Sequence, residues 1–304
     1  MIAALALALA SFQAPGITHT VPEVYVEGEP FIVNVEVSIP RDAPGHIPSW
    51  MIGSAGFVYN GRPLGRRDES HLIELAPGAE LSIQFDLAPA LEAEFQGNRR
   101  DFRISYGTQK VEATSVRVFQ AAEQGIDFMT LPFEQLSDYQ VVLRTSRGVI
   151  WAELWPDVAA NHVRNYLDLC NTGFYDDSIF HRVIPSFMIQ GGRAKTGSRA
   201  PRNVNAEFNT RPHVAGVLSM ARGDNDINSA ASEFFIVHGP SPHLDGNYSA
   251  FGKVLWGMEV VDAIAHAGNP EFRLDDKRSH RPPVDQVIEK AIVVKAKTPP
   301  VSDD

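Results

Sequence analysis

Apolar and polar residues alternate along much of the first third of the chain. In one run Val33, Val35 and Val37 alternate with polar residues. Strict alternation turns one side of a strand towards a core and the other towards water, as antiparallel sheets require. Turn-forming pairs such as Asn60-Gly61 separate the runs. The pattern predicts a small β-sandwich domain over residues 17–120, and nothing in that domain indicates its function.

The second half of the chain contains further short apolar runs. They predict eight strands, at residues 139–145, 149–155, 179–184, 187–190, 217–221, 234–237, 251–255 and 287–294. Helical spacing predicts two helices, at 156–170 and 258–266, with Gly173 ending the first. Eight short strands with two helices favour a mainly β fold, a closed antiparallel barrel, because closure removes exposed sheet edges.

The remaining segments separate or flank these two predicted domains. Residues 121–137, which include Gly125 and Pro132, are interpreted as a linker. The barrel domain then occupies residues 138–296, and residues 297–304 form a short tail.

The first ten residues are almost wholly apolar and end in Ala8-Leu9-Ala10, the type of site that signal peptidase cuts. Ten residues are too few to span a bilayer, which takes about 20. Residues 1–10 are therefore interpreted as a signal-peptide-like segment. We expect an exported protein, periplasmic or extracellular, without stable membrane insertion.

The overall charge restricts the range of partners. The formal net charge is −10 and the isoelectric point is about 5.5. A protein that binds nucleic acid needs a basic surface to replace the counterions of the phosphates. We therefore expect no nucleic-acid partner. Cys170 is the only cysteine, so an intramolecular disulfide is impossible.

Three blocks in the second half of the chain carry an unusual choice of residues. They read FYDDSIFHRVIPSFMIQGG at 174–192, GVLSMARGDNDINSAASEFFIV at 216–237 and HLDGNYSAFGKV at 243–254. In order and spacing they resemble the cyclophilin family of peptidyl-prolyl cis-trans isomerases. The resemblance covers roughly residues 138–294 and leaves the first half unexplained. It implies a cyclophilin-like barrel that isomerises X-Pro bonds in proline-containing polypeptides, with no cofactor and no metal.

The implied reaction needs no nucleophile and no proton transfer. An X-Pro amide rotates over a barrier of about 18–20 kcal/mol, because its C–N bond has partial double-bond character. An apolar pocket can hold the proline ring, and a fixed cation can favour the twisted amide, whose nitrogen regains its lone pair. By resemblance Arg182 is the catalytic cation. Its guanidinium is always charged and offers a rigid set of donors.

The resemblance also assigns substrate-binding residues. The apolar proline pocket corresponds to Phe187, Met188, Phe235 and Leu244. Gln190 matches the glutamine that hydrogen-bonds the substrate backbone and helps to hold the arginine. The other positions assigned to substrate binding are Ala221, Arg222, Glu233, His243 and Tyr248.

Four of these positions depart from the pattern of the family. Arg222 stands where asparagine is frequent, and Glu233 stands where many members have glutamine. The Glu233 carboxylate is expected to pair with Arg182 or Arg222, or to repel an acidic substrate. His243 replaces the tryptophan of cyclosporin-sensitive members, which predicts weak cyclosporin binding. Tyr248 replaces a histidine but still offers a ring and a hydroxyl.

Other chemistry fits the sequence less well. His181 is not accompanied by a nucleophile elbow, which argues against Ser-His-Asp hydrolysis. The segment 192–198 lacks the Lys-Ser/Thr of a phosphate loop. His238 and His243 sit near the expected groove, but their spacing does not define a zinc site.

Two alternative functions stay open. In the first, the barrel binds proline segments without turnover, and the N-terminal domain selects the partner. In the second, the N-terminal domain is an adhesion or glycan-binding module and the isomerase assists it. Exposed aromatic residues would favour the second, and Trp50 and Tyr59 are candidates, although a place in the core is open for either one.

Overall fold

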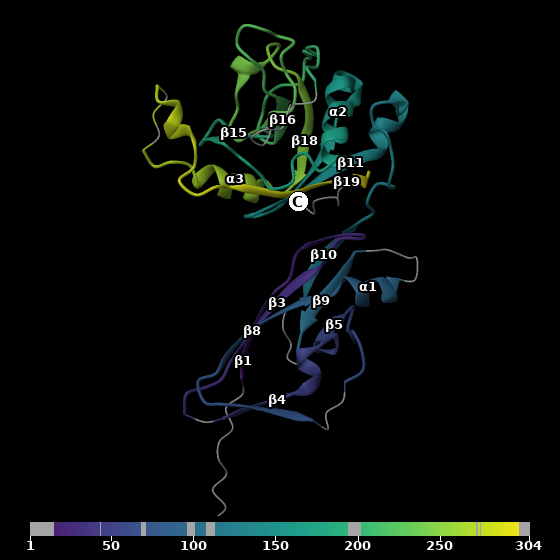
Figure 1. Ribbon diagram of the computed structural model, residues 1–304, viewed down its shortest axis with the longest axis vertical. Coiled ribbons are helices and arrows are strands. Elements are labelled where there is room, and N and C mark those ends of the chain that lie inside the picture. Colours follow the sequence, from purple (N-terminus) through teal and green to yellow (C-terminus); the bar gives the residue numbers. More distant parts are fainter. Residues whose placement is uncertain are drawn as a thin grey trace, which may run out of the picture. The chain divides into compact units, whose positions relative to one another are not determined.

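The computed structural model describes residues 15–42, 44–67, 71–95, 101–107, 113–193, 202–271, 273 and 275–297. The chain divides into two compact units, residues 1–119 and residues 120–304 (Figure 1). The signal-peptide-like segment 1–10 and residues 298–304 of the predicted tail lie outside the described residues.

The N-terminal unit is built mainly of strands. They are β1 (Gly16–Thr20), β2 (Val24–Val26), β3 (Ile32–Ser38), β4 (Gly45–Pro48), β5 (Phe57–Tyr59), β6 (Arg62–Pro63), β7 (Leu72–Leu75), β8 (Glu80–Asp86), β9 (Phe102–Tyr106) and β10 (Thr114–Phe119). The helices are α1 (Ala88–Phe95) and the short 3₁₀ turns η1 (Ser49–Ile52) and η2 (Ser54–Gly56). The strands form three sheets, in the orders β1-β3-β8, β2-β10-β9-β5-β6 and β4-β7.

Alternation along the strands produces the core of this unit. Val33, Val35 and Val37 of β3 are buried, and the residues between them are more exposed. The pairing departs from the expected antiparallel pattern at β2, which lies parallel to β10. Helix α1 was not indicated by the period-two pattern, and it buries Leu91 and Phe95 in the same core as the strands. The β-sandwich thus stays a prediction.

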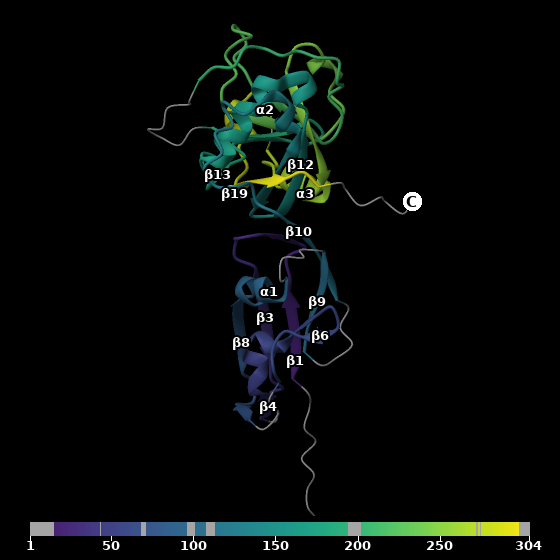
Figure 2. The ribbon, with the colours of Figure 1, turned by 90° about the vertical axis from the view of Figure 1, so that its right-hand side faces the viewer.

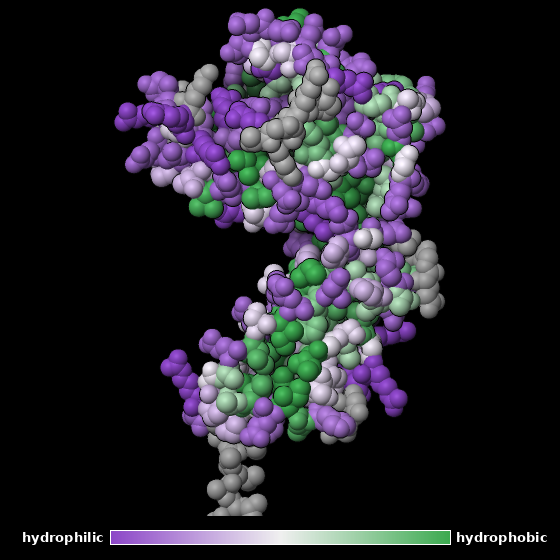
Figure 3. Space-filling view, viewed as in Figure 1, coloured by the Kyte–Doolittle hydropathy of each residue, from purple (hydrophilic) through white to green (hydrophobic). Residues whose placement is uncertain are grey.

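The two aromatic residues proposed as exposed in the N-terminal unit are packed. Trp50 is buried, and the Arg67 guanidinium lies 4.3 Å from its ring centroid. Tyr59 is half-buried between Phe95 and Phe102. Neither residue is therefore the exposed aromatic side chain that would have favoured a glycan-binding or adhesion surface. Figure 3 shows a band of hydrophobic surface on this unit.

The C-terminal unit contains one large sheet and two α-helices. Its strands are β11 (Tyr139–Thr145), β12 (Gly148–Leu154), β13 (Ser178–Ile179), β14 (Arg182–Ile184), β15 (Met188–Gly191), β16 (Val217–Met220), β17 (Phe234–Val237), β18 (Ala250–Trp256) and β19 (Val287–Lys295). The helices are α2 (Pro156–Asn171), α3 (Met258–His266) and the 3₁₀ turns η3 (Phe133–Asp138), η4 (Pro242–Leu244) and η5 (Lys277–His280). Figure 2 shows α2 and α3 lying apart on the sheet, and both contribute residues to its core.

The sheet differs from the predicted closed barrel of eight strands. Its order is β13-β19-β11-β12-β18-β16-β17-β15-β14, so it has nine strands and two end strands. The run predicted as one strand at 179–184 is divided, because the backbone N–H of Phe180 bonds Gln286 on the β19 side whereas Arg182 pairs with Gln190 of β15. Among the described residues, no hydrogen-bonded ladder joins the end strands β13 and β14, and only the covalent chain connects them. The fold is mainly β, as predicted, but the prediction of a closed barrel was wrong.

The segment 121–137, predicted as a linker, packs on the C-terminal unit. Phe128 and Leu136 are fully buried in the main core of that unit. Ala121 forms an isolated bridge with Val294, and the Arg164 guanidinium bonds the carbonyls of Phe128 and Met129. The sequence pattern did not predict this packing, because the apolar residues of the segment follow neither a helical nor a strand period.

None of the described helices combines the length and the apolar character needed to cross a membrane.

Candidate active site

Three neighbouring strands, β14, β15 and β17, each have two covered faces. Val183, Ile189 and Phe234 point into the main core of the C-terminal unit. The residues that alternate with them belong to a second, smaller apolar cluster, which includes Ile184, Met188, Phe235 and Val237. The two faces of these strands therefore serve different purposes, since one stabilises the unit and the other lines a groove.

The register of these strands sets the functional residues side by side. Arg182 of β14 is paired with Gln190 of β15, which is paired with Phe235 of β17. Residues directly opposite each other on adjacent antiparallel strands have their side chains on the same face. The guanidinium, the amide and the phenyl ring consequently form one row along the groove.

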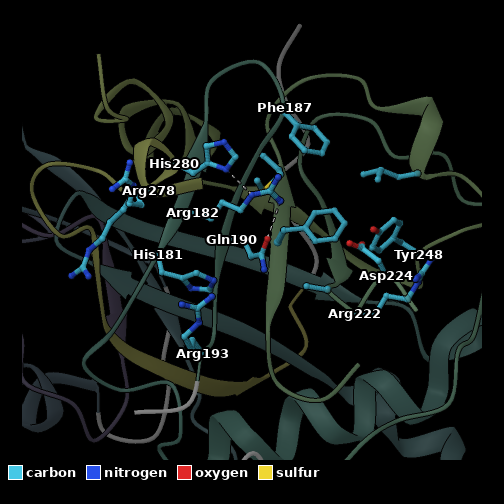
Figure 4. Close-up of a pocket in the computed structure, with 15 residues that line it drawn as sticks. His181, Arg182, Phe187, Gln190, Arg193, Arg222, Asp224, Tyr248, Arg278 and His280 are labelled. Carbon is cyan, nitrogen blue, oxygen red and sulfur yellow. Dashed lines mark hydrogen bonds between the residues drawn. The ribbon is translucent and has the colours of Figure 1, made fainter. Parts of the chain in front are cut away.

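A groove of about 700 Å³ lies over this row (Figure 4). It is lined by His181, Arg182, Phe187, Met188, Gln190, Arg193, Ala221, Arg222, Asp224, Phe235, Leu244, Tyr248, Arg278, His280 and Arg281. Of the residues proposed from the sequence, all but Glu233 and His243 belong to this lining. Glu233 lines an adjoining pocket that shares Gln190 and Ala221 with the groove. His243 is exposed, with its ring 5.3 Å from that of Phe187.

The floor of the groove is apolar. Met188, Phe235 and Leu244 are almost fully buried, and Phe187 and Tyr248 pack against them and stay half-exposed. The Tyr248 ring meets the Phe235 ring edge-on, with their centroids 5.8 Å apart. This arrangement gives a small apolar depression suited to a ring of the size of proline.

Arg182 lies at the edge of that depression. Its Nη1 donates to Gln190 Oε1 at 3.3 Å, its Nε donates to His280 Nδ1 at 3.4 Å, and its guanidinium carbon is 5.9 Å from the Phe187 ring centroid. Burial lowers the pKa of Arg182, whereas Tyr248 and Asp224 act to raise it. An arginine remains charged at neutral pH despite such a shift. Neither hydrogen-bond acceptor is a carboxylate, so neither one cancels its positive charge.

Glu233 is bound differently from the pairing expected from the sequence. Its Oε1 accepts from Arg193 Nε at 3.1 Å, and its Oε2 lies 3.2 Å from His181 Nε2 and accepts from Gln190 Nε2 at 2.8 Å. The predicted pairing with Arg182 or Arg222 was wrong, because Gln190 stands between Glu233 and Arg182. Burial alone would raise the pKa of Glu233, but His181 and Arg193 outweigh it and lower the pKa to about 2.

Glu233 fixes the orientation of the Gln190 amide. Since a carboxylate only accepts hydrogen bonds, the NH₂ end of Gln190 must face Glu233, and its carbonyl end then faces Arg182. The chain of contacts from Glu233 through Gln190 thus determines where the guanidinium is held.

Arg222 and Tyr248 form the opposite end of the groove. The Arg222 guanidinium stacks 4.8 Å from the Tyr248 ring centroid and donates to the carbonyls of Asn247 and Gly223. Position 222 thus accommodates arginine in place of asparagine, because the long side chain lies along the Tyr248 ring.

A Ser-His-Asp relay, absent from the sequence-based prediction, lies behind Phe235. His213 Nδ1 is 2.9 Å from Asp245 Oδ1, and His213 Nε2 is 3.0 Å from Ser219 Oγ. Ser219 is fully buried, so its hydroxyl cannot reach a substrate carbonyl. The His213 ring stacks on Phe235 at 6.2 Å, which gives the relay a supporting role. The only signal in the sequence was a histidine six residues before the serine.

His238, one of the two histidines weighed as zinc ligands, lies beside Asp262 and His266, with ligand atoms all within 4.8 Å. Its Nδ1 accepts from the backbone N–H of Ser186 at 2.9 Å, so in the neutral ring Nε2 carries the proton and faces Asp262 at 3.0 Å. A protonated nitrogen cannot ligate a metal. This geometry suits a histidine that holds the turn before Phe187. His243 is not part of the cluster.

Comparison with known proteins decides the family. A family model described as cyclophilin type peptidyl-prolyl cis-trans isomerase matches residues 140–293, about half of the chain. The chain belongs to the cyclophilin family. A peptidyl-prolyl cis-trans isomerase of Synechococcus elongatus is 45% identical over 116 residues, which cover 38% of this chain and 79% of that protein. Peptidyl-prolyl cis-trans isomerase B of Bacillus subtilis is 47% identical over 118 residues, 38% of this chain and 81% of that protein.

A solved cyclophilin-type isomerase of Cryptosporidium parvum, crystallised in the presence of the dipeptide ala-pro, covers 52% of this chain and 99% of its own. It is 27% identical, and the TM-score is 0.44. The resemblance found in the sequence is confirmed by the family match, and the chain is an enzyme of the peptidyl-prolyl cis-trans isomerase class. The match begins at residue 140, so membership of the cyclophilin family says nothing of the N-terminal unit.

Proposed function

We propose that this chain isomerises X-Pro bonds by holding the proline ring on the apolar floor and stabilising the twisted amide with Arg182. The observation that carries the proposal is the position of the Arg182 guanidinium at the edge of the depression formed by Phe187, Met188 and Phe235. In the transition state the amide nitrogen regains a lone pair, which a nearby donor stabilises more than it stabilises the planar ground state.

Gln190 and His280 preorganise the cation. They hold Arg182 from two sides before substrate arrives, so little reorganisation is needed at the moment of rotation. Lowering the barrier by about 7 kcal/mol would raise the rate by roughly 10⁵. Burying the ring contributes to binding, and the fixed cation contributes to the rate.

The test is the rate of proline isomerisation in a short Ala-Pro or Leu-Pro peptide, for the wild type, Arg182→Ala and Arg182→Lys. Loss of one preorganised donor should lower kcat by about 10²–10³. Lysine keeps the charge without the rigid donor set, so it should recover only part of that loss. Peptide binding, followed by chemical-shift changes, should persist in both variants.

Two outcomes would count against the proposal. A wild type that binds proline peptides without accelerating exchange would make the C-terminal unit a binding module. Full activity of Arg182→Ala would move the catalytic role to another residue.

We also propose that the protein is exported and assists the folding of other exported proteins, whose slow steps include proline isomerisation. The support is the Ala8-Leu9-Ala10 motif together with the isomerase class. For the N-terminal unit we propose a small β-sandwich, because two of its sheets share one core. Sequencing the mature N-terminus after cell fractionation tests export: an uncut chain in the cytosolic fraction would overturn it.

A further inference from the structure

The groove carries far more positive charge than the rest of the chain. The protein has 27 Lys and Arg against 37 Asp and Glu. Yet five arginines line the groove: Arg182, Arg193, Arg222, Arg278 and Arg281. Among its described lining residues, Asp224 is the single acidic one. Charge of one sign concentrated in a cleft raises the local concentration of ligands of the opposite sign.

Two of these arginines come from a segment that follows the three blocks 174–192, 216–237 and 243–254 in the sequence. Arg278 belongs to η5 (Lys277–His280), and Arg281 follows it. In Figure 4 Arg278 and His280 lie on one side of Arg182, whereas Arg222, Asp224 and Tyr248 lie on the other. The η5 segment therefore borders one end of the groove.

The η5 segment is anchored so that its arginines project outwards. Ser279 and His280 are buried, and both bond the backbone of Arg273 through Oγ and Nε2. Arg278 and Arg281 are exposed, with 93% and 58% of their side chains accessible. Because His280 also accepts from Arg182, the anchor ties the segment directly to the proposed catalytic residue.

The present partners of these arginines are weak and local. Arg278 pairs with Asp276 at 3.1 Å, and Arg281 pairs with Asp285 at 2.8 Å. Exposed ion pairs of this kind contribute about 0–1 kcal/mol, so a carboxylate of a bound peptide can take their place. Arg193 is different, since it is engaged by the partly buried Glu233.

We propose that Arg278 and Arg281 form an anion subsite that selects proline segments carrying Asp or Glu beside the isomerised bond. The inference rests on the proposed function and adds to it a substrate class. The apolar floor recognises the proline ring alone and cannot distinguish flanking residues. A carboxylate within reach of η5 would gain two charge-assisted contacts that a neutral side chain lacks.

The experiment compares pairs of peptides that are identical except that one carries Glu and the other carries Gln at a single position. That position is, in turn, each of the two residues before the proline and each of the two residues after it. The quantity measured is the ratio of kcat/KM for the Glu peptide to kcat/KM for the Gln peptide. At low ionic strength the ratio should reach about two to five at the best position, as expected for one exposed ion pair. It should approach one at about 1 M salt, where the Debye length is about 3 Å.

Three variants of the full chain separate a subsite from a loop anchor. In the double variant Arg278→Gln, Arg281→Gln the ratio should fall to one. In Asp276→Asn, Asp285→Asn the same ion pairs are broken but both arginines remain, so the ratio should rise. Arg211→Gln removes an exposed arginine paired with Asp157 outside the groove lining, and it should leave the ratio unchanged.

The outcomes distinguish this inference from the proposed function. A wild-type ratio of one at every position, or a ratio that survives loss of both arginines, would overturn the subsite. If the Glu-to-Gln ratio changed equally in the Arg278/Arg281 and the Asp276/Asp285 double variants, the arginines would only anchor the loop. That result would also overturn the subsite. The rate on the Gln peptide reports isomerase activity separately, so its loss would count against the proposed function instead.

Discussion

The N-terminal and C-terminal units are both built mainly of strands, but the second face of those strands differs. On β3 and β8 of the N-terminal unit, the residues that point away from the core are exposed or half-exposed. On β17 of the C-terminal unit all four residues are buried, since Leu244 and Tyr248 fold over its second face. A sheet face thus becomes a site when later segments of the chain cover it.

The largest expected effect comes from truncating one core residue in each unit. Phe57 and Phe234 are both fully buried, so Phe57→Ala and Phe234→Ala should each lower the free energy of unfolding of its own unit by about 3–5 kcal/mol. Urea titration monitored by unit-specific probes measures both. Only Phe234→Ala should reduce peptide isomerisation, and equal loss of activity in the two variants would contradict the functional separation of the units.

A smaller effect is expected from removing the carboxylate that orients Gln190. Glu233→Ala should lower kcat/KM about tenfold, because a charge-assisted hydrogen bond worth roughly 1.5–3 kcal/mol no longer holds the amide. Glu233→Gln is the matched control, since its carbonyl can still accept from Gln190 and should preserve most of the activity. If the alanine variant is as active as the wild type, Gln190 is held by other contacts.

Glu233 also makes the free energy of unfolding depend on pH. Since the pKa of Glu233 is about 2 in the folded chain and 4.5 ordinarily, its ionised form stabilises the fold above pH 4.5. That contribution is lost as the pH falls from 4.5 towards 2. The difference in urea midpoint between wild type and Glu233→Gln should therefore narrow over this range. A constant difference would mean that the carboxylate is not selectively stabilised in the folded chain.

The smallest effect is expected from deleting residues 1–119. Compact units of this size generally fold alone, so residues 120–304 should keep kcat/KM on a short peptide within about twofold of the full chain. Circular dichroism of the shortened chain controls for folding. A large loss in a folded protein would show that the N-terminal unit contributes to catalysis.

Much of the C-terminal fold could be predicted from local patterns. The helix at Met258–His266 has the bounds predicted from its spacing, and the helix from Pro156 differs by one residue at its end. The divided strand at 179–184 could not be foreseen, because hydrogen bonds to two distant segments, at Gln286 and Gln190, decide where it breaks. Likewise, α1 was missed because packing on β-strands stabilises it more than any helical period in its eight residues.

The sequence by itself determined the family and, by resemblance, the site residues Arg182, Gln190 and Phe235, because a distinctive motif is a local property of the chain. Tertiary structure alone decided which charges meet. It paired Glu233 with His181 and Arg193, placed His213 behind Phe235, and brought Arg278 and Arg281 to the end of the groove. Contacts between residues 22 to about 100 positions apart depend on how the sheet is ordered, and no spacing along the chain records that order.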